Sequence, residues 1–146
     1  MEKIIFDNGI KSYKINGAGV LRFNPSDPNV YARFLEAADK LQAVETALAE
    51  EAKQCDRADG AGVVQLLHRA DQEMKQVLGW VFGEENDFHK ILGGVNLLAV
   101  ADNGQRVATN LLEALQPILV EGAERCAKEK VDGAVKKAKA RRGETQ

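Results

Sequence analysis

The pattern of apolar and polar positions predicts strands at the start of this chain and helices over most of the rest. Over Ser12–Asn16 and Val20–Asn24, β-branched, aromatic and aliphatic residues recur with the spacing and composition of short strands. Asn16-Gly17 stands between them, and this pair tolerates the positive φ angles of a tight hairpin turn. We therefore predict a β-hairpin within residues 1–24.

Three longer segments carry apolar residues at intervals of three and four, which places them on one face of a helix. They predict long helices over residues 28–57, 63–82 and 105–141. Asp27 followed by Pro28 is a favourable helix start, and Gly83 is placed to end the second helix. The polar, glycine-containing stretch Ala58–Gly62 is predicted to be a loop.

Residues Gly79–Gly104 differ from the helices on either side because they hold the only tryptophan, two of the five phenylalanines and five of the thirteen glycines. We predict a Gly-rich elbow here, with a short helix from Asn86 or Asp87 to Leu92 and Asn86 as its possible cap. The expected fold class is mainly α (α+β), with the hairpin, three long helices and the short helix in one domain of residues 1–146.

Charge is unevenly distributed along the chain. From Glu36 to Asp87 there are 12 acidic and 5 basic residues, and from Lys128 to Arg142 there are 7 basic and 2 acidic. This separation favours head-to-tail self-association, although basic residues near a helix C-terminus also stabilise that helix. We expect residues 128–146 to form a basic, partly disordered tail. Its candidates for electrostatic contact are Lys136, Lys137, Lys139, Arg141 and Arg142.

The sequence contains no motif that indicates an enzyme, a metal site or a bound cofactor. His68, His89, Cys55 and Cys126 match no zinc-binding spacing, and no glycine-rich segment has a phosphate-binding pattern. The net charge of -2 disfavours nucleic acid as the main partner. No apolar run is long enough to span a membrane, and the first residues lack the apolar core of a signal peptide, so we expect a cytoplasmic protein.

An aromatic and aliphatic cluster in the elbow is the strongest candidate for a contact surface. Two interpretations are open, because such residues either complete the core or anchor a partner or a second copy. We expect Trp80 to be buried and Phe88 and Ile91 to be the better contacts. The full candidate set is Trp80, Phe82, Phe88, Ile91 and Leu92.

Three stretches together resemble a family of small tail morphogenesis proteins from phages and prophages of Gram-positive bacteria. They are KINGAGVLRFNPSDPNVYARFLEAADKL at Lys14–Leu41, WVFGEENDFHKILGGVNLLAV at Trp80–Val100 and NGQRVATNLLEALQPILVEGAERC at Asn103–Cys126. The resemblance covers about three quarters of the chain.

The resemblance implies a phage tail assembly chaperone, which is small, mainly helical, non-enzymatic and located in the host bacterial cytoplasm. Such a chaperone self-associates and keeps the long apolar helices of the tape measure protein soluble during tail morphogenesis. The alternative is a structural tail component retained in the virion, such as a tail completion, tube-associated or baseplate protein. A third possibility is a host-directed regulator that binds nucleic acid through the basic tail.

Overall fold

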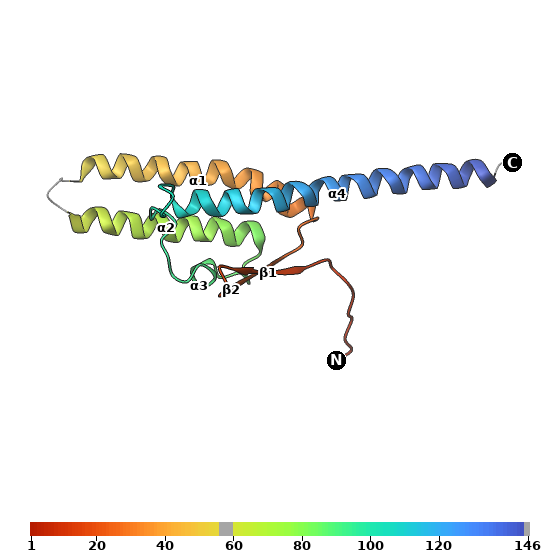
Figure 1. The fold of residues 1–146 in the computed structure, drawn as a ribbon, viewed down its shortest axis with the longest axis horizontal. Coiled ribbons are helices and arrows are strands. Elements are labelled where there is room, and N and C mark those ends of the chain that lie inside the picture. Colours follow the sequence, from red (N-terminus) through yellow and green to blue (C-terminus); the bar gives the residue numbers. More distant parts are fainter. Residues whose placement is uncertain (56–59, 145–146) are drawn as a thin grey trace.

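The fold is mainly helical, with a two-stranded hairpin near its start. The computed structural model describes residues 1–55 and 60–144, and it describes side chains as far as residue 129. The elements in chain order are β1 (Lys11–Ile15), β2 (Gly19–Phe23), α1 (Pro28–Gln54), α2 (Gly60–Phe82), α3 (Phe88–Ile91) and α4 (Val107–Glu144). Figure 1 shows α1, α2 and the first part of α4 running side by side, with the hairpin and α3 along one side of them. The predicted fold class is confirmed.

β1 and β2 form an antiparallel hairpin in which Ser12 pairs with Arg22. The turn between them places Asn16 at φ 49° and Gly17 at φ 75°, which are the positive angles that the Asn-Gly pair predicts. Leu21 and Phe23 are buried, so one face of the hairpin packs against the helices. The other face, with Ser12, Lys14, Val20 and Arg22, is exposed. A lone hairpin is marginal in water, and this packing stabilises it.

The first long helix begins as predicted and ends early. A carboxylate oxygen of Asp27 accepts a hydrogen bond from the backbone N–H of Asn29 at 2.9 Å, which is an N-cap ahead of Pro28. The helix α1 ends at Gln54, before the predicted end at residue 57. The prediction of a loop over Ala58–Gly62 is wrong for its last three residues, since α2 already begins at Gly60. The rest of that predicted loop lies outside the described residues.

The second long helix ends where glycine allows the chain to turn. Gly83 has φ +115°, and its N–H donates to the carbonyl oxygen of Gly79 at 2.9 Å. The cap of α3 is Asp87, whose carboxylate accepts from the backbone N–H groups of His89 and Lys90. The predicted cap, Asn86, is wrong because its side chain is buried and bonded to the hairpin and to α2.

Helix α4 is longer than predicted. It begins at Val107 instead of residue 105 and continues to Glu144 instead of residue 141. The prediction of a partly disordered tail over residues 128–146 is therefore wrong for the backbone up to Glu144. The side chains of residues 130–146, with the five basic contact candidates among them, lie outside the described part.

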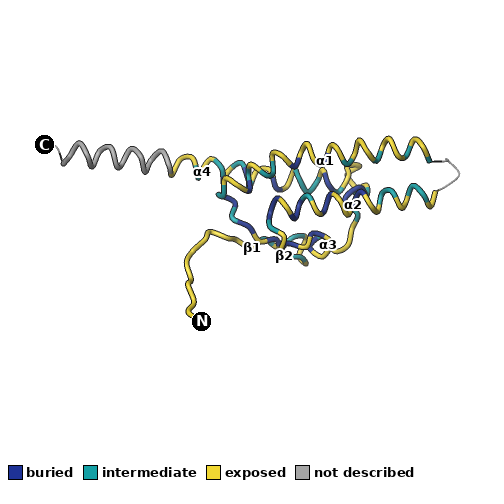
Figure 2. Tube along the Cα trace, turned by 180° about the vertical axis from the view of Figure 1, so that it is seen from behind, coloured by how far each residue is buried: buried dark blue, intermediate teal, exposed yellow. Residues whose placement is uncertain are grey.

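The core lies where the hairpin, the elbow and the three long helices meet, as the dark segments of Figure 2 show. A Cβ atom on Gly19 would lie 2.2 Å from the carbonyl oxygen of Ile91, so the hairpin sits directly on α3. The buried apolar side chains of this core include Leu21, Phe23, Val30, Met74, Leu78, Val81, Phe82, Phe88, Ile91, Leu97, Leu98, Leu115 and Leu119.

Candidate functional site

An open apolar groove lies between α1 and α2, toward the end where the two helices are connected. We call it the interhelical groove. Figure 1 shows that α4 begins well short of that end, so it covers only part of the α1–α2 pair. The apolar stripes of both helices continue past the covered part, which leaves their side chains half-buried or exposed. The apolar lining consists of Leu48, Ala49 and Ala52 from α1, Val63 and Leu67 from α2, and Leu98 from the elbow.

The rim of the interhelical groove carries acidic side chains. Glu45 and Glu50 lie along it on α1, and Glu50 forms an exposed ion pair with Lys53 at 3.5 Å. Arg106 closes the rim near the elbow, where its guanidinium donates to the carbonyl oxygen of Leu98 at 3.1 Å. An apolar floor with carboxylates at its edge suits an apolar helix face that is flanked by basic side chains.

The elbow is held on α2 by a buried ion pair. The Nζ atom of Lys75 donates to a carboxylate oxygen of Asp71 at 2.8 Å and to the carbonyl oxygen of Val95 at 2.9 Å. The other carboxylate oxygen of Asp71 accepts from the backbone N–H of Leu97 at 2.8 Å. The pair therefore bonds backbone groups at two points of the elbow, and both of its side chains are buried.

A third contact of Lys75 involves a histidine. Its Nζ atom lies 3.0 Å from Nδ1 of His89. An ammonium group has three protons and no acceptor, so Nδ1 of His89 is the acceptor in this contact. All three ammonium protons thus have internal acceptors, and the group serves as a structural donor.

Asn86 joins the hairpin to the end of α2. Its side-chain oxygen accepts from the backbone N–H of Arg22 at 2.9 Å, and its side-chain nitrogen donates to the carbonyl oxygen of Arg22 at 2.8 Å. The same nitrogen donates to the carbonyl oxygen of Phe82 at 3.0 Å. Asn86 therefore takes the place that a neighbouring strand would occupy beside β2.

The aromatic and aliphatic contact candidates of the elbow differ in how far they are buried. Phe82, Phe88 and Ile91 are 3%, 2% and 7% exposed, so in this fold they are core residues and do not face a partner. The rings of Phe82 and Phe88 continue a series of contacts from the hairpin, with centroids 4.8 Å apart for Phe23 and Phe82 and 5.8 Å apart for Phe82 and Phe88. The expectation that Phe88 and Ile91 are the better contact residues is wrong because the hairpin and α2 cover them.

Trp80 is on the surface, so the expectation that it is buried is wrong. It is 37% exposed, and the Nζ atom of Lys40 lies 4.6 Å from its ring centroid. The reason is its place on α2, where it follows the buried Leu78 and Gly79 and turns away from the hairpin. Leu92 is half-buried and packs against the core.

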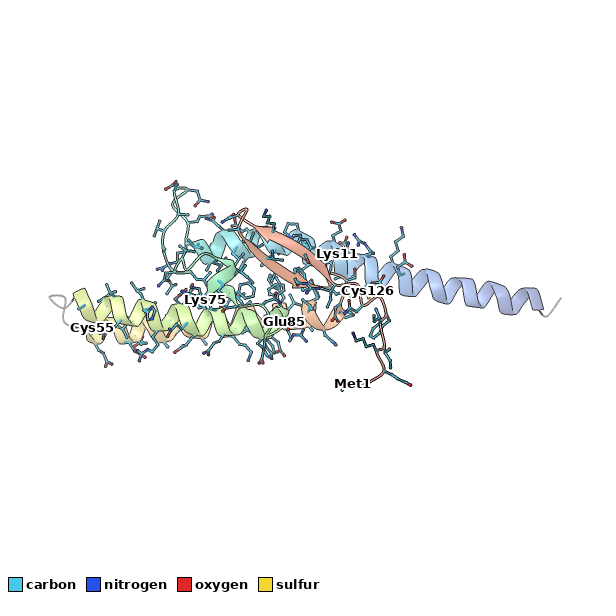
Figure 3. All side chains as sticks on the ribbon, turned by 90° about the horizontal axis from the view of Figure 1, so that it is seen from below. Met1, Lys11, Cys55, Lys75, Glu85 and Cys126 are labelled. Carbon is cyan, nitrogen blue, oxygen red and sulfur yellow. The ribbon has the colours of Figure 1, made fainter. Side chains whose placement is uncertain are left out.

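His68 and His89 both line an open pocket between α2 and the elbow, and neither cysteine is among its lining residues. Figure 3 shows Cys55 at the far end of α1 and Cys126 on α4, at opposite ends of the body, and both are free thiols. Among the side chains that the structure describes, no group of three or more His, Cys, Asp or Glu could hold a metal ion. No helix in the described ranges is long and apolar enough to cross a membrane.

Sequence reasoning missed the buried ion pair and the interhelical groove. A signal for the pair exists, since Asp71 and Lys75 are one helical turn apart and adjoin Ala70 and Met74 on the apolar stripe of α2. The groove has no such signal, because its openness depends on where the elbow and α4 begin to cover the two helices.

Comparison of the chain with protein-family models, with curated proteins and with solved structures finds no match.

Proposed function

We propose that this protein is a phage tail assembly chaperone that binds the tape measure protein in the cytoplasm of the bacterial host and has no enzymatic activity. Two supports are independent of each other. One is the resemblance of Lys14–Leu41, Trp80–Val100 and Asn103–Cys126 to small tail morphogenesis proteins. The other, which carries the proposal, is the interhelical groove with its apolar floor and acidic rim.

The groove has the size to hold a short length of helix. Its lining on α1 runs from Gln42 to Ala52, which at a rise of about 1.5 Å per residue corresponds to about 15 Å. One chaperone copy would therefore cover about three turns of a bound helix. A tape measure protein offers long apolar helices, and many copies bound along it would keep those helices out of water.

Charge supports one kind of occupant. Glu45 and Glu50 border the apolar floor, and the opposing basic rim residue is Arg106 at the elbow end. An amphipathic helix whose apolar stripe is flanked by Lys or Arg places those charges against the carboxylates. We therefore propose that the bound segments of the tape measure protein have this pattern.

The test is co-expression with the tape measure protein of the same prophage. Ala49 is exposed and lines the groove, so Ala49→Lys places a long charged side chain on the apolar floor without removing a core residue. We expect the soluble, co-purified tape measure protein to fall at least about tenfold. The matched control is Ala38→Lys, an exposed position on α1 outside the groove, which should leave co-purification unchanged. Circular dichroism should show the same helicity for both variants.

Equal co-purification by the Ala49→Lys and wild-type proteins would rule out the groove as the binding site. The location of the protein tests the function separately. A chaperone is absent from purified virions, whereas the alternative, a tail component retained in the particle, is present there in fixed copy number. Binding of nucleic acid by the purified protein would instead favour a host-directed regulator.

A further inference from the structure

The first ten residues form an arm that leaves its apolar side chains in water. We call residues 1–10 the N-terminal arm. Met1, Ile4, Ile5 and Phe6 have relative exposures of 120%, 89%, 89% and 75%. Figures 1 and 3 show Met1 well away from the body of the protein. Consecutive large apolar side chains in this state are costly, because the removal of apolar surface from water is favourable.

Local hydrogen bonds at residues 7–10 fix the direction in which the arm leaves the hairpin. The carboxylate of Asp7 accepts from the backbone N–H of Gly9 at 2.9 Å, and the side chain of Asn8 accepts from the backbone N–H of Ile10 at 3.1 Å. Asn24, just after β2, donates to the carbonyl oxygen of Asn8 at 2.9 Å. These bonds direct residues 1–6 away from the hairpin.

The outer edge of β2 is bonded at Arg22, whereas the outer edge of β1 is open. Both backbone groups of Arg22 are bonded to Asn86, so they point away from β1. In an antiparallel pair, opposite residues point their backbone groups either both toward each other or both away, so the N–H and C=O of Ser12, the partner of Arg22, point away from β2. The pattern repeats every second residue, so the same holds for Lys14. In the described part of the chain, β1 pairs with β2 alone. Its outer edge therefore presents free backbone donors and acceptors.

An apolar groove lies directly beside this open edge. We call it the β1–α4 groove. It is lined by Tyr13 and Ile15 of β1 and by Leu111, Ala114 and Ile118 of α4. Tyr13 and Ile15 lie on the inner face of the hairpin. A strand added to the edge of β1 would therefore place the side chains of its own inner face over the α4 residues that line the groove.

We propose that the N-terminal arm of one copy of this protein adds as a strand to the open edge of β1 in a second copy. Ile4 and Phe6 lie on the same face of an extended arm and enter the β1–α4 groove of that second copy. Lys3, Ile5 and Asp7 lie on the opposite face, which continues the polar outer face formed by Ser12 and Lys14. The arm thus supplies both the backbone groups and the apolar side chains that the open edge lacks.

A second copy is the occupant because the arm does not lie along its own groove. The groove follows β1 from Tyr13 to Asn16, whereas the arm leaves from the opposite end of the strand at Lys11. Folding back would require the bond between Asn24 and Asn8 to break. Exchange between copies retains that bond. This inference concerns self-association, so it does not depend on the tape measure protein.

Analytical ultracentrifugation of the full chain tests the proposal. Phe6→Glu should weaken self-association by at least about tenfold, since it replaces the largest side chain that the arm would place in the groove with a charged one. Ile5→Glu is the matched control, because the same change on the opposite face of the arm should leave association within about threefold of wild type.

The groove is tested by variants on α4. Ala114→Arg, at an exposed position in the groove, should weaken association as Phe6→Glu does. Gln116→Arg, at an exposed position on α4 outside the groove, should not weaken it.

Mixing two defective variants distinguishes arm exchange from other contacts. The Phe6→Glu protein retains an intact groove, and the Ala114→Arg protein retains an intact arm. A mixture should therefore form pairs that contain one copy of each variant, at concentrations where neither variant associates with itself. A monomeric wild-type protein would overturn the proposal, as would equal association of Phe6→Glu and wild type or the absence of mixed pairs.

Discussion

The Nζ atom of Lys75 lies 2.8 Å from a carboxylate oxygen of Asp71, one helical turn earlier on α2, and both side chains are buried, at 7% and 4% exposure. The two residues also bond backbone groups of Val95 and Leu97 in the elbow. A buried ion pair contributes little stability by itself, but the loss of one partner leaves the other charge in the interior without compensation. The pair therefore determines where the elbow is attached to α2.

Replacement of Lys75 by methionine should strongly destabilise the fold. Lys75→Met preserves most of the side-chain volume but leaves the Asp71 carboxylate without its cation and the Val95 carbonyl without its donor. We expect the free energy of unfolding, measured with urea, to fall by about 3–5 kcal/mol. Arg69→Ala, also on α2, breaks an exposed ion pair with Glu51 of α1 and should cost less than about 1 kcal/mol. Similar costs for the two variants would contradict a structural role for the buried pair.

Replacement of Asn86 by alanine should loosen the outer edge of β2. The variant loses the hydrogen bonds to both backbone groups of Arg22 and to the carbonyl oxygen of Phe82. We expect a loss of about 2–4 kcal/mol in the free energy of unfolding and faster amide exchange at Arg22. Asn103→Ala, which removes exposed hydrogen bonds with the side chain of Asn110 and the backbone N–H of Gln105, is the control and should cost less than about 1 kcal/mol. Unchanged protection of the Arg22 amide in the Asn86 variant would show that Asn86 does not hold this edge.

A methyl group at Gly122 should separate α4 from the turn after β2. A Cβ atom there would lie 1.7 Å from the carbonyl oxygen of Pro25, so backbone must move. Gly122→Ala should cost about 2 kcal/mol or more, although alanine is favoured over glycine in an open helix by up to about 1 kcal/mol. Gly60→Ala on α2, where a Cβ meets nothing within 4 Å, should be neutral or slightly stabilising. If urea unfolding shows the Gly122 variant to be as stable as wild type, α4 does not rest on Pro25.

The phenol of Tyr13 should make stability fall at high pH. Burial raises the pKa of Tyr13 above its ordinary value, and the carboxylate of Glu121 raises it further while the guanidinium of Arg125 opposes the rise. A raised pKa in the folded state means that the neutral phenol is favoured by folding. Its contribution is present below about pH 10 and is lost as the pH rises through the folded-state pKa.

Comparison with Tyr13→Phe isolates this effect, because the other titrating groups are common to both proteins. Urea unfolding between pH 8 and pH 11 should show wild type losing stability relative to the variant above about pH 10. Parallel curves for the two proteins over this range would contradict the stated role of Tyr13.

Local signals account for the elements that were predicted correctly. Asn16-Gly17 specifies its turn because it tolerates positive φ angles, Asp27 and Pro28 suit the first turn of a helix, and Gly83 allows the chain to reverse after α2. Each of these preferences acts within a few residues of the chain. Helix ends with no such signal, at Gln54 and Glu144, were placed less well.

Burial within the elbow depends on contacts between distant segments. Trp80 and Phe82 are two residues apart on α2, yet the hairpin covers Phe82 and leaves Trp80 exposed. Asn86 and Asp87 are both good caps by composition, and the bond from Asn86 to Arg22, 64 residues away, leaves the capping role to Asp87. The amino-acid pattern thus specifies the hairpin and the helices, because turns, caps and apolar periodicity are short-range properties. Which apolar faces are buried and which stay open depends on how the elbow and α4 cover α1 and α2, because burial is a property of the packed whole.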